Sequence, residues 1–153
     1  MNAVLRSNRG DTIVIVAVLL LLAGLWPITY LASPQWDVWV IDDAGKPLSN
    51  AKVRLVYQNY SAEGRSHEMT LVTGESGHVS FPRQYERASF LKRIFYIASS
   101  ASAGVHASFG RHAYVIVFGD GYEGFAVDFG HVTDWSGKPE SMTSKIAAGH
   151  HHR

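Results

Sequence analysis

The sequence contains no cysteine. This absence excludes disulfide bonds, thiolate metal sites and a cysteine nucleophile. It also excludes the lipid anchor of bacterial lipoproteins, which is attached to a cysteine. A domain of this size without covalent cross-links must rely on its packing alone.

Charge of either sign is also scarce. The 153 residues carry 14 Lys and Arg against 13 Asp and Glu, a formal net charge of +1. Without a basic field, nucleic acid is not expected as a partner, and without an acidic excess, disorder is not indicated. Aromatic residues make up 12% of the chain and, with many Val, Ile, Gly and Thr residues, they favour β structure.

One long hydrophobic run is present near the N-terminus. No charged residue occurs from Thr12 to Trp36, and residues 12–32 are predominantly apolar. About 20 apolar residues in a helix span a hydrocarbon core of ~30 Å. Arg6 and Arg9 precede the run, which favours a cytoplasmic N-terminus. We therefore predict a cytoplasmic segment 1–11, a transmembrane helix 12–32 and, behind it, a periplasmic or extracellular domain: a single-pass membrane protein.

A cleaved secretory signal and a buried soluble helix are the alternatives for this run. A signal has an apolar core of about 7–15 residues and ends in small residues. The run here is longer, Tyr30 and Leu31 are large, and Pro34 follows closely. The uncleaved anchor is favoured, and the cleaved signal would also place the domain outside the cytoplasm.

The remaining chain has the pattern of a β domain. After a spacer at 33–36, a domain is predicted over 37–130, followed by a tail at 131–153. Alternating or β-branched segments predict strands at 36–41, 51–57, 68–73, 78–81, 114–118 and 124–129. Gly- and Asp-rich turns separate them at 42–47, 74–77 and 119–122. Several short strands with turns between them indicate a mainly β fold, an antiparallel β-sandwich.

One segment changes period and predicts a helix inserted near 85–104. Ser89 is a candidate N-cap and Gly104 a candidate end. Its apolar residues share one helical face: Phe90, Leu91, Ile94, Phe95 and Ala98. A strand through 94–97 is the alternative. We expect the apolar face to cover the sandwich, and the alternative is that it docks on a membrane or a partner, with Lys92 and Arg93 at its start.

Three motifs in order resemble the carboxypeptidase regulatory-like domain. Residues 38–55 are similar to its opening hairpin, with the D-x-x-G-x-P-L turn from Asp42 to Leu48. Residues 73–81 are similar to its T-x-x-x-G hairpin, and 114–122 to its strand ending in a Gly-Tyr turn. The resemblance covers 38–81 and 114–127, about half of the chain. It implies a seven-stranded transthyretin-like, Ig-like sandwich that serves as an accessory, binding or spacer module. The segment 83–113 departs from the family pattern as an insertion.

No catalytic or cofactor motif is found. The Tyr-Arg-Gly-Ser signature of the hydroxyisourate hydrolases, which share the transthyretin-like fold, is absent, and so are H-E-x-x-H and G-x-S-x-G motifs. His150, His151 and His152 lie on a tail, and His106 and His112 lack a nearby carboxylate, so no metal site is expected. We predict no enzyme activity and no cofactor.

The sequence therefore favours a membrane-anchored extracytoplasmic binding or scaffolding module with a protein partner in the envelope. A carbohydrate- or envelope-binding module is the alternative, and an enzyme with an unrecognised site is the third. Exposed aromatics and the basic helix start supply the candidate ligand- or partner-facing residues: Trp36, Tyr122, Trp135, Lys92 and Arg93. Trp39 is a further candidate, although core packing explains it equally well.

Overall fold

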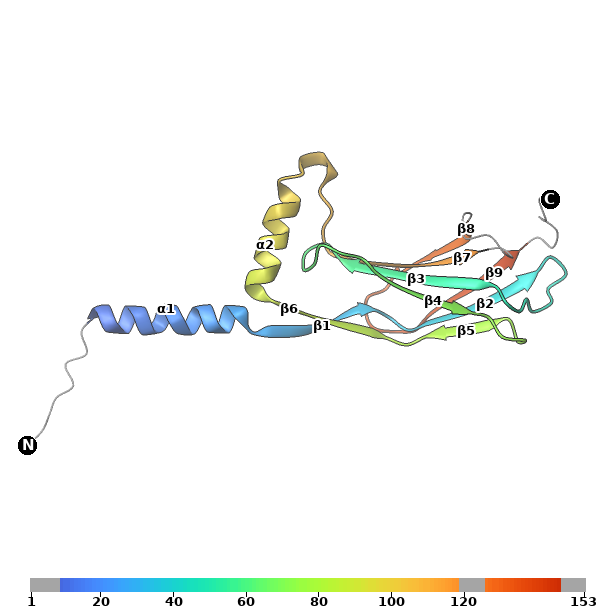
Figure 1. Ribbon diagram of the computed structural model, residues 1–153, viewed down its shortest axis with the longest axis horizontal. Coiled ribbons are helices and arrows are strands. Elements are labelled where there is room, and N and C mark those ends of the chain that lie inside the picture. The colour runs from blue at the N-terminus through green and yellow to red at the C-terminus, as the bar shows by residue number, and fades with distance from the viewer. Residues whose placement is uncertain (1–8, 119–125, 147–153) are drawn as a thin grey trace, which may run out of the picture.

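The computed structural model describes residues 9–118 and 126–146, and these are mainly β structure (Figure 1). Within this part of the chain, nine strands accompany two α-helices and one short 3-10 turn. The elements follow in the order α1 (Arg9–Leu25), β1 (Pro27–Ser33), β2 (Trp36–Asp42), β3 (Lys52–Asn59), β4 (His67–Val72), β5 (His78–Phe81), β6 (Gln84–Ser89), α2 (Phe90–Ala101), η1 (Gly104–His106), β7 (Arg111–Phe118), β8 (Ala126–His131) and β9 (Glu140–Ile146).

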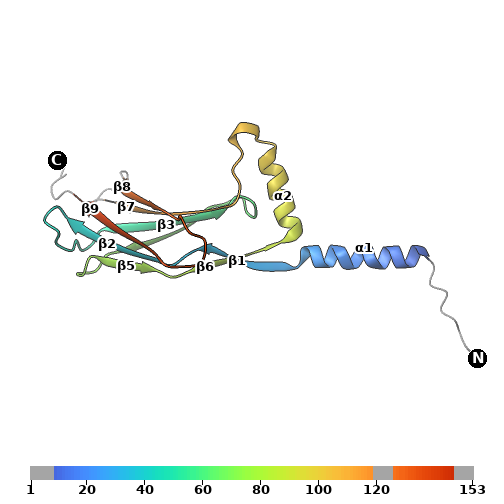
Figure 2. The same ribbon diagram turned by 180° about the vertical axis from the view of Figure 1, so that it is seen from behind.

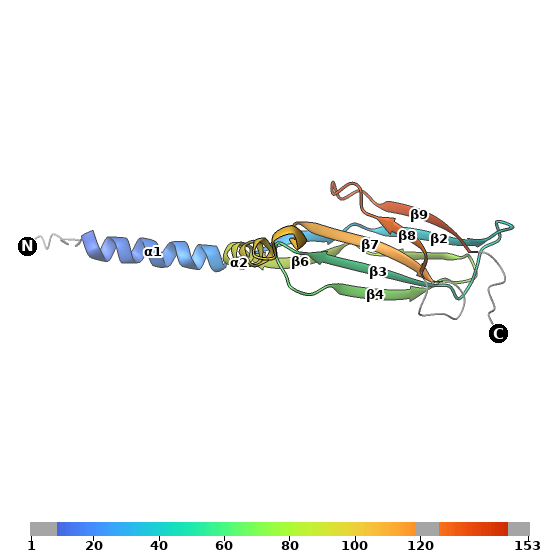
Figure 3. The same ribbon diagram turned by 90° about the horizontal axis from the view of Figure 1, so that it is seen from above.

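Two sheets share one core. A three-stranded sheet has the order β5-β2-β9, and a four-stranded sheet has the order β4-β3-β7-β8 (Figure 3). Strands β2 and β9 are parallel, whereas the other pairs are antiparallel. Side chains from both sheets meet in the core, among them Trp36, Val38, Phe81, Leu55 and Val115.

The predicted alternation of β3 is confirmed. Val53 and Leu55 are fully buried and Tyr57 nearly so, while Lys52 is exposed. Because successive side chains of a strand point to opposite faces, this pattern orients the whole four-stranded sheet. The predicted strands at 36–41, 68–73 and 78–81 correspond to β2, β4 and β5.

A two-stranded ribbon, β1 paired with β6, extends from one end of the sandwich and carries both helices. Helix α1 enters β1, and β6 leads into α2, so both helices join the ribbon at its tip, where α1 continues along the ribbon and α2 turns away from it (Figures 1 and 2). We call α1, β1, β6 and α2 together the arm.

The hydrophobic run 12–32 is not one helix. Helix α1 spans 17 residues and ends at Leu25, and residues 27–33 form strand β1. Pro27 cannot donate a backbone hydrogen bond within a helix, and the β-branched Ile28 and Thr29 favour extended backbone paired with β6. Neither helix among residues 9–118 and 126–146 combines the length and the apolarity needed to cross a membrane. The predicted transmembrane helix 12–32 and the single-pass, extracytoplasmic placement derived from it are therefore wrong.

Other expected segments are divided differently. A helix is present in the predicted insertion, as α2, but Gln84–Ser89 before it is strand β6. The expected tail contains β9, Glu140–Ile146, which completes the three-stranded sheet. The spacer 33–36 is shared between β1 and β2. The predicted turn 119–122 and the terminal histidines lie outside the described residues.

Candidate functional site

Helix α1 exposes apolar side chains in every direction. Its Ile, Val and Leu side chains from Ile13 to Leu25 are 48–69% exposed. Leu19 to Leu22 are four consecutive residues and so point about 100° apart around the helix. The helix therefore has no polar side that could face water while its apolar side was covered.

Helix α2 presents its apolar side outward, contrary to the expectation that this side covers the sandwich. Arg93, Tyr96 and Ser100 are half-buried on its inner side. The Tyr96 ring lies close to Gly64, and the Ser100 hydroxyl donates to the Tyr60 carbonyl at 3.5 Å. The outer side exposes its large apolar residues, Phe90, Leu91, Ile94, Phe95 and Ile97. An amphipathic helix whose polar side faces its own domain leaves its apolar side for another surface.

The two helices are in contact where α1 ends and α2 begins. Leu91 packs against Gly24, where an added β-carbon would stand 3.1 Å from the Leu91 Cγ atom. Trp26, Ile28 and Tyr85 are also exposed, at 73%, 56% and 58%, but Ile28 and Tyr85 point to opposite faces of the ribbon, because Ile28 pairs with Ala88 and Tyr85 pairs with Leu31. We call the exposed apolar side chains of α1 and of the outer side of α2 the arm surface.

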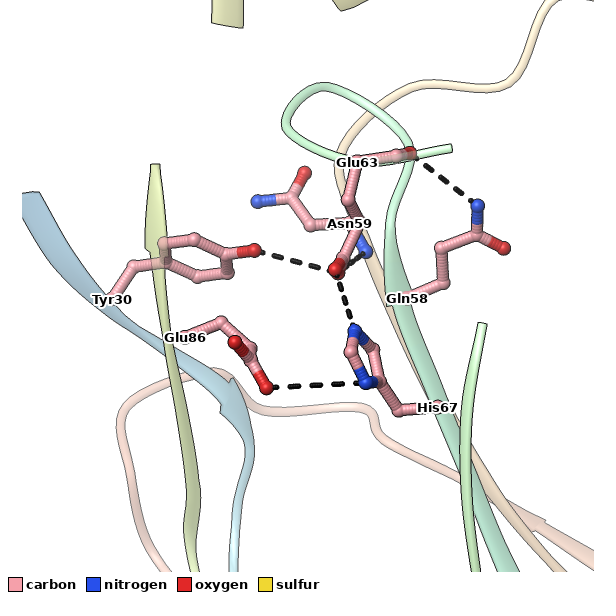
Figure 4. A network of polar contacts seen from close by, with 6 residues as sticks. All are labelled: Tyr30, Gln58, Asn59, Glu63, His67 and Glu86. Carbon is pink, nitrogen blue, oxygen red and sulfur yellow. Dashed lines mark hydrogen bonds and ion pairs between the residues drawn. The ribbon is translucent and has the colours of Figure 1, made fainter. Parts of the chain in front are cut away.

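A polar junction fastens the arm to the sandwich (Figure 4). Tyr30 of β1 and Glu86 of β6 face Glu63 and His67 from the other side. The His67 Nε2 lies 2.7 Å from Glu63 Oε2, and its Nδ1 lies 4.0 Å from Glu86 Oε1. The Tyr30 hydroxyl donates to Glu63 Oε1 at 3.4 Å. A protonated His67 can thus pair with both carboxylates and link the ribbon to β4.

The loop 60–66 holds Glu63 in place. The backbone N–H of Asn59 donates to Glu63 Oε1 at 2.9 Å, and the Asn59 Oδ1 accepts from the Ser61 N–H at 3.1 Å. The His67 ring stacks on Tyr57, with ring centres 5.0 Å apart and planes 10° from parallel. These contacts hold the Glu63 carboxylate and the His67 imidazole in place without any contribution from the arm.

Two tyrosines at the junction, Tyr30 and Tyr57, have raised pKa values. Burial, followed by the Glu63 carboxylate, raises the pKa of Tyr30 to about 12. Burial also raises the pKa of Tyr57, assisted by Glu86 and Glu63. In the part of the chain that the structure describes, no group of three His, Asp or Glu side chains has the arrangement of a metal site. The junction is thus suited to connecting two parts of the molecule.

The predicted ligand-facing tryptophans have different positions. Trp36 is 2% exposed and lies in the core, so its predicted outward role is wrong. The reason is the phase of β2, whose inner face carries Trp36, Val38 and Val40. Trp39, on the other face, is 40% exposed with its ring 4.8 Å from the His78 ring. Trp135 packs partly against the core, with the Arg111 guanidinium 4.5 Å over its ring.

The remaining candidates divide between the arm and the undescribed part. Arg93 turns inward, its guanidinium 5.0 Å over the Tyr30 ring, and so holds α2 to the ribbon. Lys92 is exposed, 5.9 Å from the Tyr96 ring. Tyr122 lies outside the described residues. The sequence did not identify the junction residues. Only Glu63 and His67 have a spacing that could have indicated a contact between them, because they are four residues apart.

Comparisons with known proteins add little. No protein-family model matches the chain, and no curated protein matches its sequence. Among solved structures, the chain is similar to 3-chlorocatechol 1,2-dioxygenase from Rhodococcus opacus 1CP, with 18% identity and a TM-score of 0.39 over 63% of this chain and 42% of that one. It is also similar to a 9R-lipoxygenase from Cyanothece PCC8801, with 12% identity and a TM-score of 0.37 over 74% of this chain and 16% of that one. The chain thus spans less than half of either protein, and these likenesses support no inference about activity.

Proposed function

We propose that this protein is a binding and assembly module rather than an enzyme, and that its arm surface binds a second copy of the same chain. The observation that carries the proposal is the outward apolar side of α2, which continues into the fully apolar α1. The sandwich acts as the compact body that presents this surface.

The proposed family of the sandwich is the transthyretin-like carboxypeptidase regulatory-like domain. Its turn motif is supported by Asp42, whose Oδ1 accepts from the Lys46 N–H at 2.8 Å, and by Gly45 at a φ of 80°. The Thr73 hydroxyl of the second motif donates to the Leu48 carbonyl at 2.7 Å and joins the two hairpins. The parallel pairing of β2 with β9 departs from the expected antiparallel pattern. The β1–β6 ribbon is antiparallel but lies outside the seven strands of the other two sheets.

The size of the arm surface suits a stable dimer. Large aliphatic side chains at this exposure present roughly 100 Å² each, so α1 alone presents on the order of 1,000 Å² of apolar surface. The largest apolar patch of an ordinary monomer is about 300–600 Å². A stable interface buries about 800 Å² on each partner. One side of α1 together with the outer side of α2 supplies that area, and the apolar residues on the opposite side of α1 stay exposed in the dimer.

Charge complementarity favours a second copy, with the two α1 helices parallel. Among the described residues of α1, the charged ones are Arg9 and Asp11. They have opposite signs, and both lie in the first turn of the helix. In a parallel two-fold pair, Arg9 lies beside the partner's Asp11, and the same contact recurs on the other side of the axis. An antiparallel pair would instead place these charges beside the apolar end at Leu25, where they would lose water without gaining a partner.

The proposal is tested by the oligomeric state of the full chain in sedimentation velocity. The unmodified chain is expected to sediment as a dimer, and Leu20→Asp, at a site 68% exposed on α1, is expected to sediment as a monomer. Val72→Asp is the matched control, because Val72 is 52% exposed on β4 away from the arm and the variant should remain dimeric.

Charge exchange tests the parallel orientation. Arg9→Glu or Asp11→Arg alone should weaken the dimer by placing like charges together, and the double exchange should restore it. A monomeric unmodified chain would overturn the proposal. Association that appears only with phosphatidylcholine vesicles would also overturn it, because the occupant would then be lipid.

A further inference from the structure

A small pocket opens on the outer face of the four-stranded sheet, away from both the core and the arm surface. Its volume is about 160 Å³. Val56 and Tyr57 line it together with the polar residues Gln58, Tyr60, Ser66, Glu68, His112 and Tyr114. The strand register explains why they meet: Val56 of β3 pairs with both Glu68 of β4 and Tyr114 of β7, and Gln58 pairs with His112. Residues paired across a sheet share one face.

The aromatic side of the pocket is held in a fixed orientation. Tyr60 meets His112 edge to face, with ring centres 5.1 Å apart and planes at 78°. The His112 Nε2 lies 3.1 Å from the Phe109 carbonyl oxygen. A carbonyl oxygen can only accept, so Nε2 carries a proton, and Nδ1 is the acceptor of the neutral ring.

The charge of the pocket is compensated. The Glu68 carboxylate lies 3.4 Å from the Arg54 guanidinium, whose Nε also donates to the Thr70 hydroxyl at 3.1 Å. A carboxylate paired in this way keeps its acceptor oxygens without requiring a cationic ligand. The other lining groups are hydroxyls, an amide and an imidazole, which both donate and accept.

We propose that this pocket binds one neutral pyranose ring, as the end or a single residue of a glycan. The pocket volume of about 160 Å³ is close to that of a cavity that holds one benzene ring. Because the pocket is open, a pyranose ring would enter it with part of its hydroxyl groups left in water. The tyrosine rings offer flat apolar faces for the C–H groups of a sugar, and the surrounding hydroxyl, amide and carboxylate groups can hydrogen-bond its hydroxyls. This site differs from the tryptophans that the sequence singled out, and it does not depend on self-association through the arm.

An NMR titration of the ¹⁵N-labelled full chain tests the pocket. The probes are D-glucose, D-galactose, N-acetyl-D-glucosamine and chitotetraose, each added separately. At least one should move the backbone amide signals of Gln58, Tyr60, Ser66, Glu68 and His112, with saturable concentration dependence. Signals of α1 should stay unmoved.

Variants separate the pocket from the rest of the sheet face. Tyr60→Ala and the isosteric Glu68→Gln should each weaken binding about tenfold or more. Phe129→Ala is the matched control: it removes an aromatic that is 54% exposed on the same face, since Phe129 pairs with Ile116, but lies outside the pocket. Its affinity should be unchanged, and circular dichroism checks that each variant is folded.

Three outcomes would overturn the proposal: no amide shift with any probe, shifts confined to other regions, or equal weakening by Phe129→Ala. The monomeric variant Leu20→Asp should bind the same sugar as the unmodified chain. The sugar titration therefore tests the pocket proposal, and sedimentation tests the dimer proposal, so that either proposal can fail without the other.

Discussion

The indole of Trp36 lies against the backbone of Gly130, so that a β-carbon at residue 130 would stand 3.0 Å from the Trp36 Cζ3 atom and 2.8 Å from the Met142 sulfur. Gly130 belongs to β8 of one sheet, whereas Trp36 and Met142 belong to β2 and β9 of the other. This contact sets how closely the two sheets approach. It also explains why a large aromatic at residue 36 is an interior side chain.

Gly130→Ala is therefore expected to destabilise the fold. Forcing one methyl group into a packed interior costs about 1–3 kcal/mol, and urea denaturation followed by circular dichroism measures the loss. Gly74→Ala is the control, because no atom lies within 4 Å of its added β-carbon, and its effect should stay within about 0.5 kcal/mol. Equal losses for both variants would contradict the close sheet contact.

Because the pKa of Tyr30 is raised, we expect the folded chain to lose stability at high pH. The Tyr30 pKa of about 12 in the folded chain lies above the ordinary value of 10.0. Because the folded state holds this proton more tightly, the contribution is complete below pH 10 and is lost as pH rises toward 12. Tyr30→Phe should remove that part of the alkaline decline, as seen in denaturation midpoints measured across this range. Identical alkaline curves for the variant and the unmodified chain would refute the assignment.

Because the pKa of Asp37 is lowered, we expect the folded chain to lose stability at low pH. Hydrogen bonding from Ser80 lowers the pKa of Asp37, and Gln35 and His78 add to this effect. A lowered pKa gives stability that is present above the ordinary value of 3.8 and is lost as pH falls below it. Asp37→Asn should flatten the acid side of a stability curve measured by thermal unfolding. The same change at the exposed Asp43 should leave that curve as it is.

We expect Ser89 to stabilise the first turn of α2 as its N-cap residue. The Ser89 Oγ accepts from the Lys92 N–H at 3.2 Å, which caps the first turn. Loss of such a cap costs about 1 kcal/mol, so Ser89→Ala should lower hydrogen-exchange protection of the α2 amides about fivefold. Ser99→Ala, at an exposed position inside the helix, should leave protection equal or slightly higher, because alanine is the better helix former. A fall in protection for both variants would argue against the cap.

Sequence periodicity predicted the strands that have one buried and one solvent-facing side. In β3 the buried Val53 and Leu55 alternate with the more exposed Lys52 and Arg54. The same reasoning failed for β9, where Ser141, Thr143 and Ser144 suggest a tail and the strand arises from pairing with β2. Tertiary contacts there override weak local preference.

Apolarity without a period was the least reliable guide. The run 12–32 is uniformly hydrophobic, and its division at Pro27 depends on pairing between Ile28 and Ala88, residues that are distant in the sequence. The junction could not be predicted from the sequence either, because Tyr30, Glu63 and Glu86 belong to separate elements that meet only in the folded chain. The aromatic character of Trp36 is evident from the sequence, but the phase of β2, which decides whether its side chain lies inside or outside, is not.

The parallel pairing of β2 with β9 affects the order in which the molecule can assemble. Residues 36–42 bond to residues 140–146, so nearly the whole domain lies in the intervening loop. Bringing such distant segments together is a slow entropic step, and it follows the local hairpins. Until it is complete, β2 has one unbonded edge and the Trp36 side of the core is uncovered. The folding chain therefore passes through a state in which its own C-terminal strand competes with any other extended strand for that edge.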